Sequence, residues 1–370
     1  MQILFKNNLA FDQPLSIISC HKLSDVKYSF MKMDGALKKG FYLAGFISYE
    51  AGYAFEERLS NNKIYDFPLL YFGVYENPHP LSRACPPMAG ERAVNHKARA
   101  KEIQGEGLTV SKTEYLKKIS RIKEHLAAGD SYQVNYTFKT KFNYSGDHYS
   151  LYRQLARRQP TPYSAFLRTD NFSILSLSPE LFFRKEGNKI LVKPMKGTIA
   201  PGKGKARLLR NDSKNRSENL MIVDLLRNDL GRVARVGSVK PVKLFEIEKH
   251  KTLYQMTSSL QAEIDPAIDL FSLFRHLFPS GSVTGAPKIR TMEIIRRIEK
   301  EERKIYTGAI GYITPEREMS FNVAIRTLLL NGSKGEMGIG SGVTFGSDPI
   351  CEYKECLLKA EFLFGNAGCI

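Results

Sequence analysis

The chain contains no tryptophan, and its five cysteines never form a Cys-x-x-Cys pair. An odd number of scattered cysteines argues against a disulfide framework and favours reduced thiols. No stretch of about 18 apolar residues occurs, which argues against a membrane-spanning helix. The first residues, "MQILFKNNLAFDQPL", also lack the basic and apolar regions of a secretory signal. We therefore expect a cytoplasmic protein that does not associate with a membrane.

Acidic residues are few relative to basic ones, with 38 Asp and Glu against 55 Lys and Arg. A formal charge of +17 attracts polyanions, but by itself it does not distinguish nucleic acid from small anionic molecules. The basic residues are spread along the whole chain, without an Arg-rich tail, zinc-finger spacing or an RNA-recognition signature. We expect no nucleic-acid partner. A basic nucleotide- or nucleic-acid-binding protein remains the alternative from a different functional class.

The order of periodic segments favours an α+β fold, a large mixed domain of antiparallel sheets packed with helices. Helical and strand patterns alternate irregularly, and the strands come in hairpin-like runs, unlike a doubly wound parallel sheet. Residues 1–75 form a strand-rich N-terminal region that we expect to pack on the main domain. Residues 76–110 concentrate proline, glycine and charge, as in a linker or surface loop. The main domain is expected over residues 111–364.

Within the main domain, Ser111 and Glu114 have the spacing of a capping box, and Gly129 is placed to close the helix that follows. Further patterns predict strands and helices in the order strand 131–142, strands within 163–195, helix 217–231, strands within 239–262, helix 286–302, strands within 305–345 and helix 351–364.

The stretch "KPMKGTIAPGKGKA" contains Gly197 to Lys203 in the pattern GxxxxGK. A phosphate-binding loop requires Ser or Thr at the next position to hold magnesium, but this chain has Gly204. Pro201 also removes one backbone donor. The pattern therefore argues against a nucleotide site, and on local grounds Lys196 is a solvated turn lysine.

The segment "DPICEYKECLLKAEFLF" places Glu352, Glu355 and Lys359 on one helical face. Such a face is either a solvated ion-pair surface or an oxygen-ligand site for Mg²⁺. Glu218, beside the apolar run of another predicted helix, is a candidate third carboxylate. Taken alone, Glu218 is an acid near a helix N-terminus that the helix dipole favours.

Two glycine-rich segments and one arginine suggest an anion site. In "FPSGSVTGAPK", turns lead into a helix, so its first N–H groups can face an anion, although an ordinary loop is the alternative. We interpret "GIGSGVT" as a second, flexible turn that brings further N–H donors. Arg326 lies within an apolar run and needs an anionic partner if it is buried. Together these features predict a pocket for a small dicarboxylate.

Several motifs resemble those of the chorismate-utilising enzymes, the family of the anthranilate, isochorismate, salicylate and aminodeoxychorismate synthases. The resemblance covers residues 111–364, and it is carried by "SLSPELFFR", "KPMKGT", "ENLMIVDLLRNDLGRV", "PSGSVTGAPK", "YTGAIGY", "AIRT", "GSGVT" and "DPICEYKECLLKA", in that order. It implies the chorismate-binding enzyme fold, with chorismate as substrate and Mg²⁺ as cofactor.

The resemblance also assigns roles to residues. It implies that Mg²⁺ is held by Glu218, Glu352 and Glu355, and that Glu180 is a general acid for the leaving 4-hydroxyl group. Such an acid must be protonated, so we expect a sheltered site to raise the pKa of Glu180. The implied substrate-binding residues are Thr198, Thr284, Gly285, Tyr306, Arg326, Ser341, Gly342 and Lys359.

Two positions bear on the branch of the family. The anthranilate-forming members have alanine where this chain has Lys196, whereas the aminodeoxychorismate-forming members have a lysine that adds to the substrate ring at C2. The isochorismate and salicylate members activate water with another lysine, which corresponds to Gln133 here. The combination resembles the aminodeoxychorismate branch, which supplies p-aminobenzoate for folate, and the anthranilate branch is the alternative. Gln255 stands where several anthranilate-type members have histidine.

The resemblance implies two protein partners. The chain shows no evident glutaminase triad, so ammonia is expected from a separate glutamine amidotransferase subunit. The sequence ends at "FGNAGCI" without a fused lyase. A separate aminodeoxychorismate lyase is therefore expected to complete p-aminobenzoate.

Overall fold

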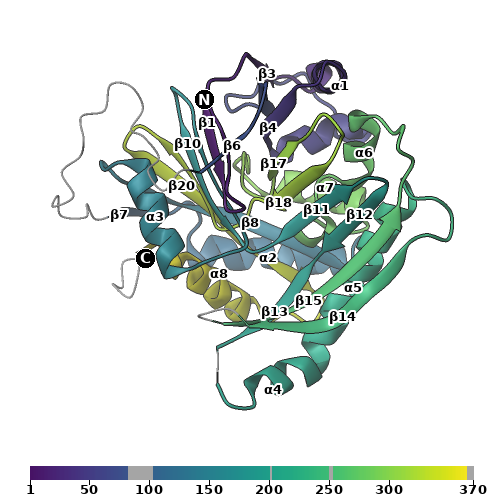
Figure 1. Cartoon of the computed structure of the whole chain (residues 1–370). Coiled ribbons are helices and arrows are strands. Elements are labelled where there is room, and N and C mark those ends of the chain that lie inside the picture. Colours follow the sequence, from purple (N-terminus) through teal and green to yellow (C-terminus); the bar gives the residue numbers. More distant parts are fainter. Residues whose placement is uncertain (82–102, 201, 250–252, 365–370) are drawn as a thin grey trace.

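A computed structural model describes residues 1–81, 103–200, 202–249 and 253–364 of the chain (Figure 1). The described residues form two large sheets with helices on their outer faces. The segment expected to be a linker, 76–110, lies partly outside the described residues. Its described ends contribute β6 (His79–Pro80) and β7 (Gln104–Leu108).

The first sheet, sheet A, has ten described strands, all of them antiparallel to their neighbours. Its order is β16 (Gly285–Ala286), β8 (Gln133–Asn143), β20 (Lys334–Thr344), β19 (Thr327–Asn331), β10 (Ser173–Ser178), β9 (Tyr163–Arg168), β1 (Gln2–Phe5), β2 (Leu9–Phe11) and β6, with β7 also paired to β8.

The second sheet, sheet B, also has ten described strands in antiparallel pairing. Its order is β13 (Met195–Ile199), β15 (Tyr254–Glu263), β12 (Lys189–Lys193), β11 (Leu181–Glu186), β18 (Met319–Val323), β17 (Ala309–Ile313), β4 (Tyr42–Ile47), β5 (Leu70–Tyr75) and β3 (Ser16–Cys20), with β14 (Lys240–Lys249) also paired to β15.

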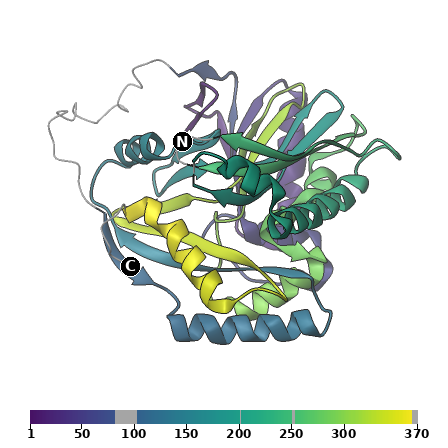
Figure 2. The same ribbon diagram turned by 90° about the horizontal axis from the view of Figure 1, so that it is seen from below.

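The described helices are α1 (Leu23–Lys38), α2 (Lys112–Ala127), α3 (His148–Arg158), α4 (Lys205–Asn211), α5 (Ser213–Gly231), α6 (Leu270–Leu277), α7 (Lys288–Ile298) and α8 (Pro349–Phe364), with short 3-10 turns η1 (Tyr49–Phe55), η2 (Glu57–Leu59) and η3 (Gly281–Val283). Figure 2 shows α2 and α8 side by side beneath the strands of sheet A.

Part of the apolar core lies between the two sheets. Ile3 and Leu167 of sheet A are fully buried together with Phe46 and Ile310 of sheet B. Burying such side chains stabilises the fold by roughly 1.5–3 kcal/mol each, because their apolar surface leaves water. Packing of the two sheets against this shared core therefore fixes their positions relative to each other.

The predicted α+β class is confirmed, and the helix that begins at Ser111 forms as expected. The Ser111 hydroxyl accepts a hydrogen bond from the Glu114 N–H at 3.2 Å. The other half of the capping box is replaced by ion pairs, because the Glu114 carboxylate lies 2.7 Å from Lys300 and 3.5 Å from Lys118.

Strands of the N-terminal region lie inside both sheets. In sheet A, β1 pairs with β9, with Ile3 opposite Leu167. In sheet B, β4 pairs with β17, with Phe46 opposite Ile310. Residues 1–75 therefore share hydrogen-bonded ladders with strands from the later part of the chain.

The interpretation of "GIGSGVT" as a flexible turn is wrong. Residues 338–344 lie inside β20, where Gly340, Ser341 and Gly342 pair with Thr137, Tyr136 and Asn135 of β8. A glycine-rich composition is typical of turns, but glycine is also required within a strand where large groups pack closely against the backbone.

A buried guanidinium connects three segments of the fold. Arg303 donates hydrogen bonds to the Glu299 carboxylate at 2.7 and 2.9 Å, to the Asn135 carbonyl at 2.6 Å and to the Val283 carbonyl at 2.9 Å. Its guanidinium also lies 4.3 Å from the centroid of the Tyr49 ring. Since the side chain is 2% exposed and Glu299 is 6% exposed, this ion pair is shielded from water.

We expect Arg303→Met to lower the free energy of unfolding by about 3–5 kcal/mol, because it leaves a buried carboxylate without its cation. Urea denaturation measures the change. The control is Arg227→Met, which breaks the exposed pair with Asp224 and should cost less than about 1 kcal/mol. If both variants lowered the free energy of unfolding by the same amount, the buried pair would contribute no more to stability than the exposed pair, contrary to this prediction.

Candidate active site

The site lies where the edge of sheet B meets the end of β20 in sheet A. Lys196 is on the edge strand β13, and its Nζ lies 3.5 Å from Glu218 Oε2 on α5. The same Nζ is 3.1 Å from the point that a Cβ on Gly342 would occupy. The fold therefore brings Lys196, Glu218 and Gly342 together.

Gln133 lies beside this lysine with an unused side-chain amide. Its Nε2 is 2.9 Å from the Cβ position of Gly342. The residue is 1% exposed, and among the described residues neither its Nε2 nor its Oε1 has a hydrogen-bond partner. Burying an amide without a partner is costly. A polar group bound at the site would remove that cost.

One face of β20 near the site carries glycines and therefore has no side chains. Side chains alternate along a strand, and Gly338, Gly340 and Gly342 share one face of β20 while the Ser341 side chain points to the opposite face. A Cβ on Gly338 would lie 2.1 Å from the ring of Tyr306. At about 3.3 Å per residue, Tyr306 and Lys196 are separated by roughly 13 Å along the strand. Both side chains therefore border the same glycine face.

Among the described residues, the end of β20 near the site has a paired strand on one side only. The pairing of β19 with β20 extends only to Met337, so residues 338–344 have β8 on one side alone. In an antiparallel pair, alternate residues direct their N–H groups away from the partner strand. The sequence predicted that this glycine segment would supply N–H donors to a ligand. A strand without a partner on one side can also supply such donors.

Glu180 is buried between two strands of different sheets. It follows the end of β10 and precedes β11, and its Oε1 accepts a hydrogen bond from Ser282 Oγ at 2.6 Å. Burial raises the pKa of Glu180 to about 7, although the Ser282 hydrogen bond and the charge of Lys196 oppose the rise. The raised pKa expected from the sequence is confirmed. At neutral pH a large share of this carboxyl is protonated.

Arg326 is a half-buried cation that has no anionic partner among the described residues. Among the described residues its side chain has no hydrogen bond or ion pair, and burial lowers the pKa of its guanidinium. Its backbone has φ of 50°, in the left-handed region, and its carbonyl accepts a hydrogen bond from the Leu177 N–H at 3.0 Å. Such a group is suited to an anionic ligand.

The last helix directs charged groups toward β20. Lys359 Nζ donates to the Gly340 carbonyl at 2.9 Å and lies 2.7 Å from Glu355 Oε1, so these two residues share a face as expected. Burial raises the pKa of Glu355, but the charges of Lys359, Lys196 and Lys214 outweigh it, so its pKa is lowered overall. Glu352 instead accepts a hydrogen bond from Ser347 at 2.8 Å.

The three carboxylates expected to bind Mg²⁺ do not form a cluster. Among the residues that the structure describes, no group of three His, Cys, Asp or Glu side chains is placed to hold a metal ion. Glu218 faces the ammonium groups of Lys196 and Lys214, and Glu355 faces that of Lys359. The oxygen donors suit a hard cation, and lysine ammonium groups supply the positive charge beside them.

The remaining candidate residues contribute less directly. The Thr284 hydroxyl donates to the Ser280 carbonyl at 3.1 Å, and the Ser341 hydroxyl lies 3.3 Å from Tyr115 Oη. Thr198 is exposed on β13, opposite Gln255 of β15. Gly285 pairs with Val134 of β8. The side chains of Thr284 and Ser341 are thus already engaged within the protein.

Two residues at the site, Ser282 and Lys214, were not predicted from the sequence. Ser282 lies within the recognised segment "PSGSVTGAPK", but its contact with Glu180 joins residues about a hundred positions apart. Lys214 lies one helical turn before Glu218, at 3.9 Å, a spacing that the sequence does show.

Comparison with known proteins places the chain in a family. It belongs to the chorismate binding enzymes, whose family model matches residues 8–365. Aminodeoxychorismate synthase component 1 of Bacillus subtilis is 39% identical over 248 residues, which cover 65% of this chain and 53% of that protein. Anthranilate synthase component 1 of Cereibacter sphaeroides is 35% identical over 255 residues, which cover 67% of this chain and 51% of that protein. The chain thus aligns with little more than half the length of these relatives.

A solved structure supports the same fold. Anthranilate synthase component I from Streptococcus pneumoniae superimposes with a TM-score of 0.80 and 22% identity, covering 98% of this chain and 92% of that one. None of the helices in the described part of the chain is long and apolar enough to cross a membrane.

We expect the carboxyl of Glu180 to titrate near pH 7, as measured by isotope-edited infrared spectroscopy against a Glu180→Gln blank. Ser282→Ala should raise its pKa, because the serine hydroxyl stabilises the charged form. Because folding raises the pKa of Glu180, its protonation favours the folded state. This contribution to the free energy of unfolding is complete below the pKa of the unfolded chain and is lost as the pH rises through 7. A midpoint near the ordinary glutamate pKa would contradict the buried placement.

Proposed function

We propose that this protein is an aminodeoxychorismate synthase component I, which converts chorismate and ammonia into 4-amino-4-deoxychorismate. The observation that carries the proposal is the position of Lys196 at the centre of the site, beside Glu218, Gln133 and Gly342. The similarity to aminodeoxychorismate synthase component 1 from several bacteria supports the same branch. The product would serve p-aminobenzoate and folate synthesis.

The substrate would lie over the glycine face of β20. Chorismate carries two carboxylates, and the unpaired guanidinium of Arg326 is suited to one of them. Tyr306, Lys359 and the free backbone donors around Ser341 and Gly342 would complete its binding, with Thr198, Thr284 and Gly285 at the margins. Because Arg326 has no anion among the described residues, substrate binding would provide its missing partner.

Glu180 and Lys196 would carry out the chemistry. Lys196, once neutral, would attack ring carbon C2 while the double bond shifts and the 4-hydroxyl leaves as water with the proton of Glu180. Ammonia would then attack C4, shift the double bond back and expel the lysine amine. Glu180 would recover its proton from the newly added ammonium group. The net reaction consumes chorismate and ammonia and releases aminodeoxychorismate and water.

Magnesium is proposed as the cofactor, held by Glu218, Glu352 and Glu355. When bound, it would neutralise a substrate carboxylate and orient the ring. The lysines that now face Glu218 and Glu355 would then be free to act on the substrate. Lys196, which Glu218 holds at 3.5 Å, is the one the proposed reaction needs.

Two partners are proposed. Ammonia would come from a separate glutamine amidotransferase subunit, a proposal supported by the name "component 1" of the bacterial relatives. A separate aminodeoxychorismate lyase would act on the product. No nucleic-acid partner is proposed.

Anthranilate synthase component I is the second candidate, favoured by relatives of that name at 35–36% identity. Both reactions use chorismate and ammonia, but only this alternative releases pyruvate and an aromatic product. Lys196 is the residue that favours the first candidate, because the resemblance places alanine there in the anthranilate branch.

Incubation with chorismate, Mg²⁺ and an ammonium salt, followed by mass-resolved product analysis, distinguishes the two candidates. We expect a product that keeps its enolpyruvyl group and becomes p-aminobenzoate only when an aminodeoxychorismate lyase is added. Anthranilate with pyruvate would assign the protein to the sister branch. No turnover of chorismate would overturn both candidates.

Lys196→Ala should lower kcat by at least about a hundredfold, because it removes the nucleophile, while chorismate binding measured by calorimetry is retained. The control is Lys203→Ala, which removes the exposed lysine of the GxxxxGK pattern and should leave kcat unchanged. Turnover by Lys196→Ala close to that of the unaltered protein would remove the covalent step from the proposal.

Glu355→Gln should weaken Mg²⁺ binding, because it removes one charged oxygen ligand. The readout is the rise in unfolding temperature during a Mg²⁺ titration, which does not depend on turnover. Glu361→Gln, an exposed change on the same helix, serves as the control. If Glu355→Gln and the unaltered protein gave the same titration curve, the proposed metal site would be wrong.

A further inference from the structure

A buried ion pair closes the base of the loop that carries Ser282. Residues 278–287 form this α6–α7 loop, which connects α6 to α7. Lys288 Nζ, on the first residue of α7, lies 2.6 Å from Asp229 Oδ2 on α5. The same ammonium group donates a hydrogen bond to the carbonyl of Leu277, the last residue of α6, at 3.0 Å. One cation therefore connects the two ends of the loop and fastens them to α5.

This ion pair is shielded from water. The side chain of Lys288 is 13% exposed and that of Asp229 is 6% exposed. Burial raises the pKa of Asp229, although the charges of Lys288 and Arg232 oppose the rise. Separating the two charged groups would leave each of them without its partner in a poorly solvated place, which is costly. The ends of the α6–α7 loop are therefore held against α5.

The loop also packs closely on α5. Leu225 lies one helical turn before Asp229, on the same face of the helix. A Cβ on Gly281 would lie 2.5 Å from the Leu225 side chain and 3.7 Å from Asp229 Oδ2, which leaves no room for a side chain unless Leu225 moves. The residue after Gly281 is Ser282. The position of Ser282 therefore depends on contacts between the loop and α5.

Ser282 couples the position of the loop to Glu180. Its hydroxyl donates to Glu180 Oε1 at 2.6 Å and lies 3.0 Å from Ser280 Oγ. Because a hydroxyl has one proton to donate, Ser280 is the donor in the second contact. The ammonium group of Lys196 also acts on Glu180, and like the Ser282 hydroxyl it favours the charged form. The proton affinity of Glu180 thus depends on where the loop places Ser282.

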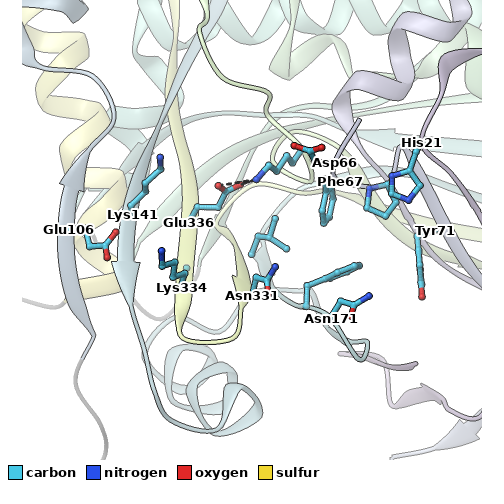
Figure 3. A pocket seen from close by; sticks show the side chains of 15 residues that line it. His21, Asp66, Phe67, Tyr71, Glu106, Lys141, Asn171, Asn331, Lys334 and Glu336 are labelled. Atoms are coloured by element: carbon cyan, nitrogen blue, oxygen red, sulfur yellow. Dashed lines mark hydrogen bonds and ion pairs between the residues drawn. The ribbon is translucent and has the colours of Figure 1, made fainter. Parts of the chain in front are cut away.

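Other ion pairs lie away from this loop. Figure 3 shows a cavity at the beginning of β20, where Glu336 lies 3.2 Å from Lys304, and none of its lining residues belongs to α5 or to the α6–α7 loop. Arg317, between β17 and β18, lies 2.7 Å from Asp34 on α1 and donates to the Ile268 carbonyl at 2.8 Å. In this pair, too, one cation binds a carboxylate and a backbone carbonyl, but it holds a different part of the fold.

We propose that Asp229 and Lys288 are positioning residues for the general acid. Their ion pair holds the α6–α7 loop against α5 and keeps the Ser282 hydroxyl within hydrogen-bond distance of Glu180. The role of Glu180 as a general acid rests on the proposed function. The effect of the ion pair on the contact between Ser282 and Glu180 does not.

The test compares the pKa of Glu180, measured by isotope-edited infrared spectroscopy, in single and double variants. In the otherwise unaltered chain, Ser282→Ala should raise this pKa by about 0.5–1, the effect of one lost hydrogen bond. In the Lys288→Met background, Ser282→Ala should change it by less than about half as much, because Ser282 is already displaced. Equal effects of Ser282→Ala in the two backgrounds, or no effect in the unaltered chain, would overturn the proposal.

The matched control is Arg317→Met. It also removes a cation that binds a carboxylate and a backbone carbonyl, and urea denaturation measures the stability that each variant loses. In the Arg317→Met background, Ser282→Ala should change the pKa of Glu180 as much as in the unaltered chain. If its effect were lost in both backgrounds, general loosening of the fold would govern the position of Ser282, and the proposal would be wrong.

Asp229→Asn is a milder change, which keeps the test decisive if Lys288→Met does not fold. It removes the carboxylate charge but keeps the shape of the side chain and an oxygen that can accept a hydrogen bond from Lys288. The effect of Ser282→Ala on the pKa of Glu180 should then be smaller than in the unaltered chain by at least about a third. An undiminished effect would contradict the positioning role.

The infrared measurement needs no turnover, so the two proposals fail in different ways. If the protein did not convert chorismate but the effects of Ser282→Ala and Lys288→Met were non-additive, the proposed function would be wrong and the role of the ion pair would stand. If chorismate were converted and the two effects were additive, only the role of the ion pair would be overturned.

Discussion

The arrangement of this protein depends on one shielded ion pair. Arg303 holds the carbonyl groups of Asn135 in β8 and Val283 in η3, and its charge is balanced by Glu299 at the end of α7. Moving the buried guanidinium away from these partners would leave a charged group unpaired away from water, which is costly. The segments that carry the partners are therefore held in place. This contact fixes the loop that carries Ser282 relative to the strand that begins at Gln133.

From that constraint the chemistry of the site follows. Ser282 donates to Glu180 at 2.6 Å, and the burial of Glu180 raises its pKa to about 7. Among the described residues, neither amide atom of Gln133 has a hydrogen-bond partner, and the side chain lies beside a lysine from the other sheet. Burying these polar groups costs folding free energy. The same buried groups would give a polar ligand hydrogen bonds that are stronger than those in water.

The glycines of β20 show a second constraint. Gly338 is required because the Tyr306 ring occupies the space of a side chain, and Gly342 because Gln133 and Lys196 do.

The sequence by itself determined the α+β class, the capped helix after Ser111, the shared face of Glu355 and Lys359, and the likeness to chorismate-using enzymes, because these depend on local spacing and ordered motifs. Only the tertiary structure decided that "GIGSGVT" is a strand, that Ser282 meets Glu180, that the three expected metal ligands contact other protein groups, and that Arg326 has no anionic partner among the described residues. Apart from the local partners of Glu352 and Glu355, these features depend on residues far apart in the chain, whose distance and burial are set by packing of the two sheets and leave no periodic signal in the sequence.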